Sequence, residues 1–327
     1  MFENELKVGL EAVDKAMKIS MKIQKELTAG DKLDKSDRSP VTIADFTSQA
    51  VICSILNNSF PDIPIVGEEE STDLKKPENG EVLNNINKFL KNEEEVFNCL
   101  YQQDILKSID LGNGSPDNNV FWTLDPIDGT KGFLRGEQYA VALALIKNGK
   151  VVLGISGCPN LDIESEAGDE GFIFYAVLNQ GSYKINCQTG KTEKIRVTDH
   201  LDKSRMRFVQ SYESGHGNLE LQIEIAEKLE IGEPPVQLDS QVKYGIVASG
   251  NAEIYLRIPN PKSPDYKEKI WDHAAGSIIV EEAGGIVTDI KGRSLDFSLG
   301  SKLEGNTGIL ATTSGLQSEI LEIISKS

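Results

Sequence analysis

The chain has 327 residues, of which 39% are hydrophobic and 6% aromatic, enough to bury a substantial core in one large domain or two smaller ones. Its 51 acidic and 34 basic residues give a net charge of −17 at pH 7. Nucleic acid polymers and anionic membranes attract basic surfaces, so this charge argues against both as partners. Small phosphates would be repelled too, unless bound cations or a local basic pocket offset the charge.

The sequence predicts a cytoplasmic protein. Its acidic beginning, Met1 to Glu5, lacks the basic and apolar regions of a signal peptide. No apolar run approaches the roughly 20 residues that a membrane span needs. The four cysteines lie far apart without a C-x-x-C pair, which favours reduced thiols over disulfides or a zinc site. They are Cys53, Cys99, Cys158 and Cys187.

The N-terminal region predicts two helices. Apolar residues at spacings of four and three indicate one core-facing helix stripe: Leu6, Leu10, Val13, Met17 and Met21. Val41-Thr42-Ile43 is then interpreted as a short strand leading into a second helix, with Asp45 at its mouth. Residues 71–119, rich in Asn, Glu and Lys, are interpreted as a peripheral insertion that is helical around 82–106. Nothing in this segment suggests a catalytic or binding role.

The rest of the chain predicts a change of architecture. Residues 139–146 and 151–156 form a predicted hairpin around Asn148-Gly149, and 172–178 and 182–186 form a second. Further on, strands at 208–211 and 254–258 alternate with helices at 218–229 and 272–283, the last ending at Gly284-Gly285. We therefore expect an N-terminal α+β subdomain (1–190) with a largely antiparallel sheet, and a C-terminal α/β subdomain (191–327).

The segment from Trp122 to Thr130 is the most informative motif. Asp125 and Asp128 flank a Pro-Ile pair, and the Gly129-Thr130 step that follows could open a helix. Carboxylates and carbonyls are the oxygen ligands that Mg²⁺ prefers, and N–H groups at a helix start suit a phosphate. A lone D-x-x-D is more often a solvated turn, so this motif needs support from elsewhere.

Three more acidic sites supply that support. Glu68 and Glu69 follow a short apolar run, Asp45 lies near a helix start, and Asp272 opens another helix. Each is ordinary alone, because acids are favoured near helix N-termini. Together with the central motif they indicate metal-assisted phosphate chemistry.

These motifs, in this order over residues 45–285, resemble the Mg²⁺-dependent, lithium-sensitive phosphatase superfamily. That superfamily includes inositol monophosphatase, inositol polyphosphate 1-phosphatase, fructose-1,6-bisphosphatase and the 3'(2'),5'-bisphosphate nucleotidases. The resemblance implies a layered αβαβα sandwich with the active site between two subdomains. It also implies two or three Mg²⁺ ions and inhibition by Li⁺.

The resemblance further implies roles for individual residues. Glu68, Asp125 and the Ile127 carbonyl would hold one metal ion, and Asp125 would bridge to a second ion held by Asp128 and Asp272. Glu69 would help to hold a third. Asp45 and Thr130 would activate the attacking water, and the N–H groups of Gly129 and Thr130 would bind the phosphate that is cleaved. Five converging carboxylates would raise one another's pKa in the absence of metal, which is a reason to expect the ions.

The segment Leu238 to Tyr244 resembles the bisphosphate nucleotidases. By that resemblance Ser240, Lys243 and Arg257 would form a pocket for a second phosphate, and His216, in a Gly-rich loop, would stack on adenine. The expected reaction removes the 3'-phosphate of 3'-phosphoadenosine 5'-phosphate to give AMP. The corresponding phosphosulfate and, more weakly, inositol 1,4-bisphosphate are further expected substrates. A small phosphorylated nucleotide is thus the expected partner of a protein expected to be a monomer.

Two alternatives stay open at this point. An inositol monophosphatase-like enzyme would have no use for a second phosphate site, so replacing Lys243 should matter little to it. Separately, Lys243 could be a solvated surface lysine. A non-catalytic protein that binds divalent cations would need the carboxylates but not the Asp45–Thr130 pair. His273 is expected to be a packing residue, and Thr130 could also serve as a helix cap.

Overall fold

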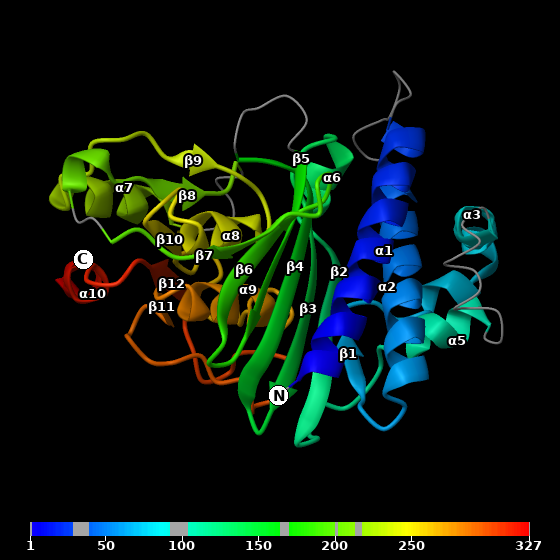
Figure 1. Cartoon of the computed structure of the whole chain (residues 1–327). Coiled ribbons are helices and arrows are strands. Elements are labelled where there is room, and N and C mark those ends of the chain that lie inside the picture. The colour runs from blue at the N-terminus through cyan, green and yellow to red at the C-terminus, as the bar shows by residue number, and fades with distance from the viewer. Residues whose placement is uncertain are drawn as a thin grey trace.

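In the computed structural model, two β-sheets and three layers of helices stack in the order helix, sheet, helix, sheet, helix (Figure 1). The structure describes residues 2–28, 39–91, 104–163, 170–199, 202–212 and 218–326. The predicted αβαβα sandwich is confirmed. Among the described residues, no helix has the length and apolar character needed to cross a membrane.

The first sheet contains seven strands that neighbour one another in chain order. They are β1 (Ile65–Gly67), β2 (Val120–Asp128), β3 (Ala140–Lys147), β4 (Lys150–Asp162), β5 (Glu170–Val177), β6 (Gly181–Asn186) and β7 (Thr192–Ile195). β1 runs parallel to β2, and all later pairs are antiparallel. Both predicted hairpins are confirmed. Asn148 and Gly149, with φ of 52° and 73°, form the two-residue turn whose twist matches the strands.

Helices α1 (Glu3–Thr28) and α2 (Ser39–Ser59) cover the outer face of this sheet, and α3 (Gly80–Lys91) and α5 (Ile105–Asp110) pack beyond α2. The predicted strand at Val41-Thr42-Ile43 is wrong, because α2 already begins at Ser39. Pro40 suits the first turn of a helix, and burial of the segment that follows outweighs the strand preference of β-branched residues.

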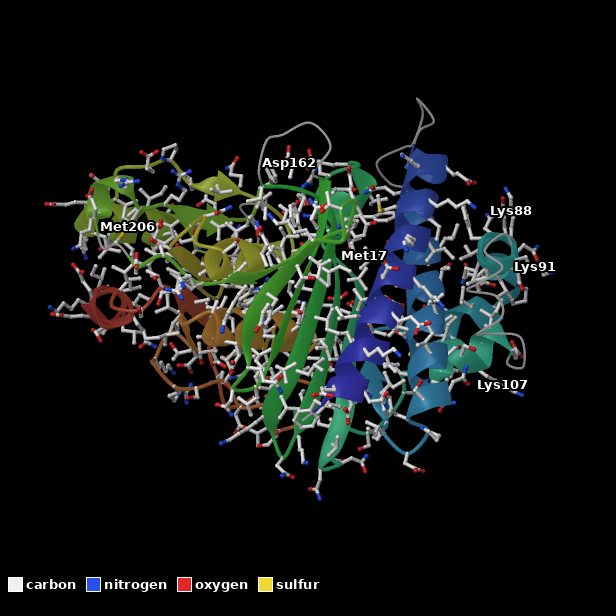
Figure 2. All side chains as sticks on the ribbon, viewed as in Figure 1. Met17, Lys88, Lys91, Lys107, Asp162 and Met206 are labelled. Carbon is white, nitrogen blue, oxygen red and sulfur yellow. The ribbon has the colours of Figure 1, made fainter. Side chains whose placement is uncertain are left out.

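Two other predictions in this region need correction. Met21 is 36% exposed, since successive steps of four drift around a helix of 3.6 residues per turn, and Ile23 faces the core instead. Residues 71–119 are not merely peripheral, because α3 and α5 contribute Ile86, Phe89, Leu90 and Ile109 to the first core. Residues 92–103 lie outside the described part. Lys88, Lys91 and Lys107 mark the outer side of this region in Figure 2.

The second sheet has the strand order β11-β12-β10-β8-β9. Its members are β8 (Phe208–Gln210), β9 (Val236–Gln237), β10 (Ile254–Arg257), β11 (Ile286–Thr288) and β12 (Ile309–Thr312). The middle layer between the sheets consists of α8 (Val242–Ala248) and α9 (Ala274–Glu282). The outermost layer consists of α7 (Leu219–Lys228) and α10 (Gln317–Lys326). The predicted alternation in this half is confirmed.

Within the described residues, three hydrophobic cores lie at the layer interfaces, and strand alternation divides side chains between them. On β3, Val141, Leu143 and Leu145 face the outer helices, whereas the alanines and Ile146 between them face the middle layer. Met17 belongs to the first core and Met206 to the third, and they lie well apart in Figure 2. The boundary at 190/191 stays a prediction. β7, which starts at Thr192, still pairs with the first sheet.

Candidate active site

A cavity of about 490 Å³ lies where the end of β2 meets α8, the end of β10 and the turn before α9. It brings together ten of the predicted site residues: Glu68, Asp125, Ile127, Asp128, Gly129, Thr130, Ser240, Lys243, Arg257 and Asp272. The remaining lining includes Lys131, Leu134, Ser211, Asp239, Gln241, Tyr255, Tyr266 and His273. Carboxylate side chains and the cationic side chains of Lys243 and Arg257 therefore line the same cavity.

The parallel pairing of β1 and β2 explains why two distant acidic motifs meet. Gly67 is in register with Leu124, and the Glu68 N–H donates to the Leu124 carbonyl at 3.2 Å. Parallel strands in register deliver their following residues to the same sheet edge. Glu68 thus lies next to Asp125, and its charge raises the pKa of the Asp125 carboxyl.

The acidic end of the cavity, lined by Glu68, Asp125, Asp128 and Asp272, contains a buried carboxylate at its centre. Asp125 is 2% exposed, and its Oδ1 atom has no hydrogen-bond partner among the described residues. Burial and then the charges of Glu68, Asp128 and Asp272 raise its pKa well above the usual range. Burial also raises the pKa of Asp272, as does Asp128. An orphaned, buried carboxylate oxygen among further oxygen donors fits a hard divalent cation.

Asp45 lies behind this cluster on α2 rather than at a helix mouth, and it is buried. Burial, followed by the charges of Glu69 and Glu68, raises its pKa. Burial and the Glu68 charge likewise raise the pKa of Glu69 to about 7. Within the described structure no hydrogen bond joins Asp45 to Thr130, so their pairing stays a prediction.

Gly129 connects the carboxylate strand to the short helix α6 (Thr130–Leu134). Its φ of 95° lies in the left-handed region, and a Cβ atom here would lie 2.9 Å from the Cβ of Ser240. A side chain at position 129 would therefore collide with the segment that carries the cationic residues. Thr130 begins α6 and lines the cavity, as predicted.

Lys243 and Arg257 line the same cavity, and burial raises the pKa of Asp128 while their charges lower it. We call this part of the lining the basic end. Lys243 is 3% exposed on α8; its Nζ donates to the Leu238 carbonyl at 3.3 Å and lies 5.4 Å from the Tyr255 ring centroid. The interpretation of Lys243 as a solvated surface lysine is therefore wrong. Burial lowers its pKa to about 8, while the charge of Asp128 opposes that shift, so it remains a cation at neutral pH.

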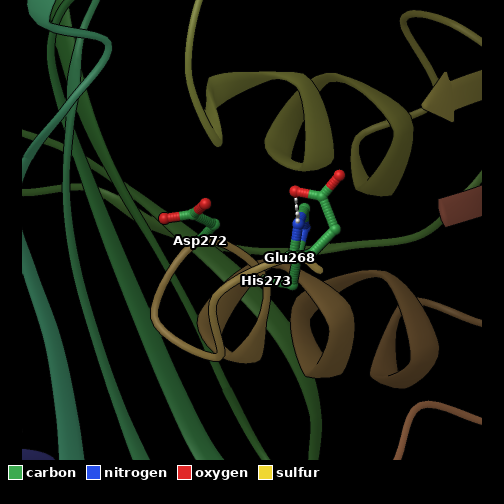
Figure 3. A group of neighbouring side chains, drawn as sticks. All are labelled: Glu268, Asp272 and His273. Carbon is green, nitrogen blue, oxygen red and sulfur yellow. Dashed lines mark hydrogen bonds and ion pairs between the residues drawn. The ribbon is translucent and has the colours of Figure 1, made fainter. Parts of the chain in front are cut away.

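Arg257 ends β10 and pairs through Nε with Glu268 Oε1 at 2.8 Å. Glu268, Asp272 and His273 form a possible metal-binding group, with one ligand atom of each within 4.8 Å of the others. Figure 3 shows Glu268 joined to the His273 ring while the Asp272 carboxylate points away from that pair. Both oxygens of Glu268 already have partners, whereas Asp272 faces the carboxylate cluster.

Gln241, which connects Asp128 to the segment that carries Lys243, was not identified from the sequence. The backbone N–H of Gln241 donates to Asp128 Oδ2 at 2.6 Å, and its side-chain Nε2 donates to the Trp271 carbonyl at 2.8 Å. It lies beside Ser240 in the same segment, which was the only available signal. The ion pair of Arg135 with Asp239, also at the cavity, was missed as well. His216 lies outside the described residues.

The whole chain, residues 2–327, matches the family model described as the inositol monophosphatase family. The chain belongs to this metal-dependent family. It is 43% identical to a 3'(2'),5'-bisphosphate nucleotidase of Oryza sativa, over 98% of this chain and 93% of that protein. It is 42% identical to the enzyme of the same name from Dictyostelium discoideum, over 98% and 96%.

A solved inositol monophosphatase from Zymomonas mobilis shares the fold, with a TM-score of 0.66 and coverage of 99% of both chains at 19% identity. The superfamily resemblance is thus confirmed by both sequence and fold. The relatives at about 40% identity are phosphatases by name.

Proposed function

We propose that this chain is a Mg²⁺-dependent, Li⁺-sensitive 3'(2'),5'-bisphosphate nucleotidase. It would convert 3'-phosphoadenosine 5'-phosphate to AMP and phosphate. One observation carries the proposal: a buried lysine and an arginine line the same cavity as the cluster of carboxylates around Asp125. A substrate with two separated phosphates would use both ends, whereas an inositol monophosphate would leave the basic end unused.

The proposed metal ligands are Glu68, Asp125, the Ile127 carbonyl, Asp128 and Asp272, with Glu69 for a further ion. When bound, Mg²⁺ supplies an acidified water and shields phosphoryl charge. Thr130 would orient that water through its hydroxyl, with Asp45 accepting the Thr130 proton. The N–H groups of Gly129 and Thr130, at the start of α6, would bind the phosphate that leaves.

Lys243 and Arg257, with the Ser240 hydroxyl, would hold the second phosphate at the other end. His216 would contact the adenine. The same pocket would accept 3'-phosphoadenosine 5'-phosphosulfate and, more weakly, inositol 1,4-bisphosphate, because each presents a second anionic group. A fixed cationic pocket would also position the ester bond against the carboxylate end.

The test is phosphate release with Mg²⁺ from 3'-phosphoadenosine 5'-phosphate and from inositol 1-phosphate, with Asp125→Ala as the blank. We expect strong preference for the nucleotide. Lys243→Ala should raise KM for the nucleotide about 10- to 100-fold, the effect of losing a charge-assisted contact. Preference for the inositol ester, unchanged in Lys243→Ala, would instead identify an inositol monophosphatase. Mg²⁺ binding without any turnover would identify a cation-binding protein.

We also propose that the enzyme acts as a monomer in the cytoplasm. The described cysteines, Cys53, Cys158 and Cys187, are free thiols, which suits a reducing compartment. Light scattering should give a mass near 35.8 kDa. A mass twice that value would reject the monomer.

A further inference from the structure

Arg257 reaches the cavity from the end of β10, at the basic end of the site. Its contact with Glu268 uses the Nε–H and not the two terminal amino groups. Those amino groups form the fork with which arginine binds phosphate. An arginine side chain also has many rotamers, so holding this fork at one place in the cavity requires a fixed partner.

Glu268 is such a partner, because it is itself held on its other side. Its Oε2 atom lies 3.2 Å from His273 Nε2, and His273 Nδ1 lies 2.8 Å from the Tyr244 hydroxyl. Glu268 is 6% exposed, and His273 and Tyr244 are each 1% exposed. With Glu268 as a carboxylate acceptor, His273 donates a hydrogen bond through Nε2 and accepts one at Nδ1 from the Tyr244 hydroxyl. Both ring nitrogens of His273 are then hydrogen-bonded.

The network links α8, the turn before α9 and β10, the three segments that surround the basic end. Figure 3 shows that it diverges from Asp272, whose carboxylate points to the other side. Among the described residues, its hydrogen bonds lead to Arg257 and none leads to Asp272, although the charge of Glu268 contributes to the raised pKa of Asp272. A change in Glu268 should therefore disturb the second phosphate site before it disturbs the site of cleavage.

We propose that Glu268, held by His273 and Tyr244, is a positioning residue that fixes Arg257 and sets the selectivity for bisphosphates over monophosphates. This inference rests on the proposed nucleotidase function. Adenosine 3'-monophosphate carries the same 3'-phosphate and base but no 5'-phosphate. Its kcat/KM should therefore not depend on the position of the Arg257 amino groups.

The experiment compares steady-state kinetics of wild type and Glu268→Gln, with saturating Mg²⁺, on 3'-phosphoadenosine 5'-phosphate and adenosine 3'-monophosphate. We expect kcat/KM for the bisphosphate to fall about 10- to 100-fold, mostly through KM, because a charge-assisted contact is lost. The monophosphate value should change less than about threefold. Arg257→Lys, which keeps the charge but not the fork, should give the same split.

Glu319→Gln serves as the matched charge control, since Glu319 pairs with Lys203 at 2.6 Å on α10, outside the cavity. Glu319→Gln should leave kcat/KM unchanged for both substrates. A thermal unfolding midpoint for each variant separates lost selectivity from lost folding. If Glu268→Gln does not fold, Glu268→Asp, which keeps the charge but shortens the side chain that contacts the Arg257 Nε–H, decides the matter by the same comparison of substrates.

Equal loss on both substrates by folded variants, or no loss on either, would overturn the inference and leave the nucleotidase function intact. A wild-type enzyme that does not prefer the bisphosphate would overturn the proposed function, and this inference with it.

Discussion

At the scale of single residues, Gly129 decides how closely the two halves of the site approach. It joins the carboxylate strand to the turn that we propose binds phosphate, and Ser240, itself at a φ of 67°, packs directly against it. Two backbone segments in left-handed conformations thus meet where the substrate would lie. Only glycine leaves room for this approach without displacing Ser240.

Gly129→Ala should therefore lower kcat/KM for the bisphosphate about 100-fold, the typical result of a small displacement of positioned groups. Gly136→Ala is the matched control: Gly136 has a φ of 73°, but a Cβ there would contact nothing within 4 Å. Both variants bear a similar backbone cost of about 1–2 kcal/mol, and Gly129→Ala also has to displace Ser240, so its unfolding midpoint should fall further than that of Gly136→Ala. Similar activity losses in the two variants would refute the role of the contact with Ser240.

At the scale of elements, α2 supports the loop that carries the proposed metal ligands Glu68 and Glu69 through one side chain. Gln49 Oε1 accepts from the Glu69 N–H at 3.1 Å, and Nε2 donates to the carbonyls of Glu69 and Ile109 at 2.5 and 3.0 Å. Gly67 and Gly112 make room for it, since a Cβ at either would lie within 2.6 Å of the amide. The loop that carries Glu68 is thus attached to both α2 and α5.

Gln49→Leu should leave backbone groups of Glu69 unpaired and reduce the free energy of unfolding by about 1–3 kcal/mol. It should also raise the Mg²⁺ concentration for half-maximal activity about tenfold or more, as loss of groups that orient metal ligands does. Gln317→Leu, which removes a contact between α10 and Thr288 at 2.9 Å, provides the control. It should alter stability without changing the Mg²⁺ requirement; a shift there of the same size would contradict this account.

At the scale of the whole molecule, local patterns predicted the two hairpins and the later alternation of strands and helices, whereas the superfamily resemblance predicted the layers and the roles of the site residues. Alternation along the strands and the Asn148-Gly149 turn are short-range signals, and the acidic motifs stand in a familiar order. The start of α2 was missed because burial, not local preference, decided it. The Gln241 contacts and the Glu268–His273–Tyr244 chain were missed because they join segments about 30 to 110 residues apart or depend on side-chain direction. Such contacts leave no periodic trace in a sequence.

The concentration of buried carboxylates also has a consequence for the stability of the entire fold. Burial and mutual repulsion raise the pKa of Asp45, Asp125 and Asp272. The metal-free folded state therefore binds more protons than the unfolded chain above pH about 4, and its stability falls as pH rises through that range.

Unfolding in EDTA should consequently show a midpoint that decreases from pH 5 to pH 8. Mg²⁺ should raise the midpoint more at pH 8 than at pH 5, because the ion replaces protons at the carboxylates. The difference should shrink in Asp125→Asn. Equal Mg²⁺ effects at both pH values would show that these carboxylates are not the metal site.

The most direct test of the two-ended cavity is a crystal structure of the product complex with AMP, inorganic phosphate and Mg²⁺. We predict inorganic phosphate at the N–H groups of Gly129 and Thr130, metal ions on Asp125, and the AMP phosphate on Lys243 and Arg257. An AMP phosphate bound at Gly129 and Thr130, or outside the cavity, would contradict the central claim.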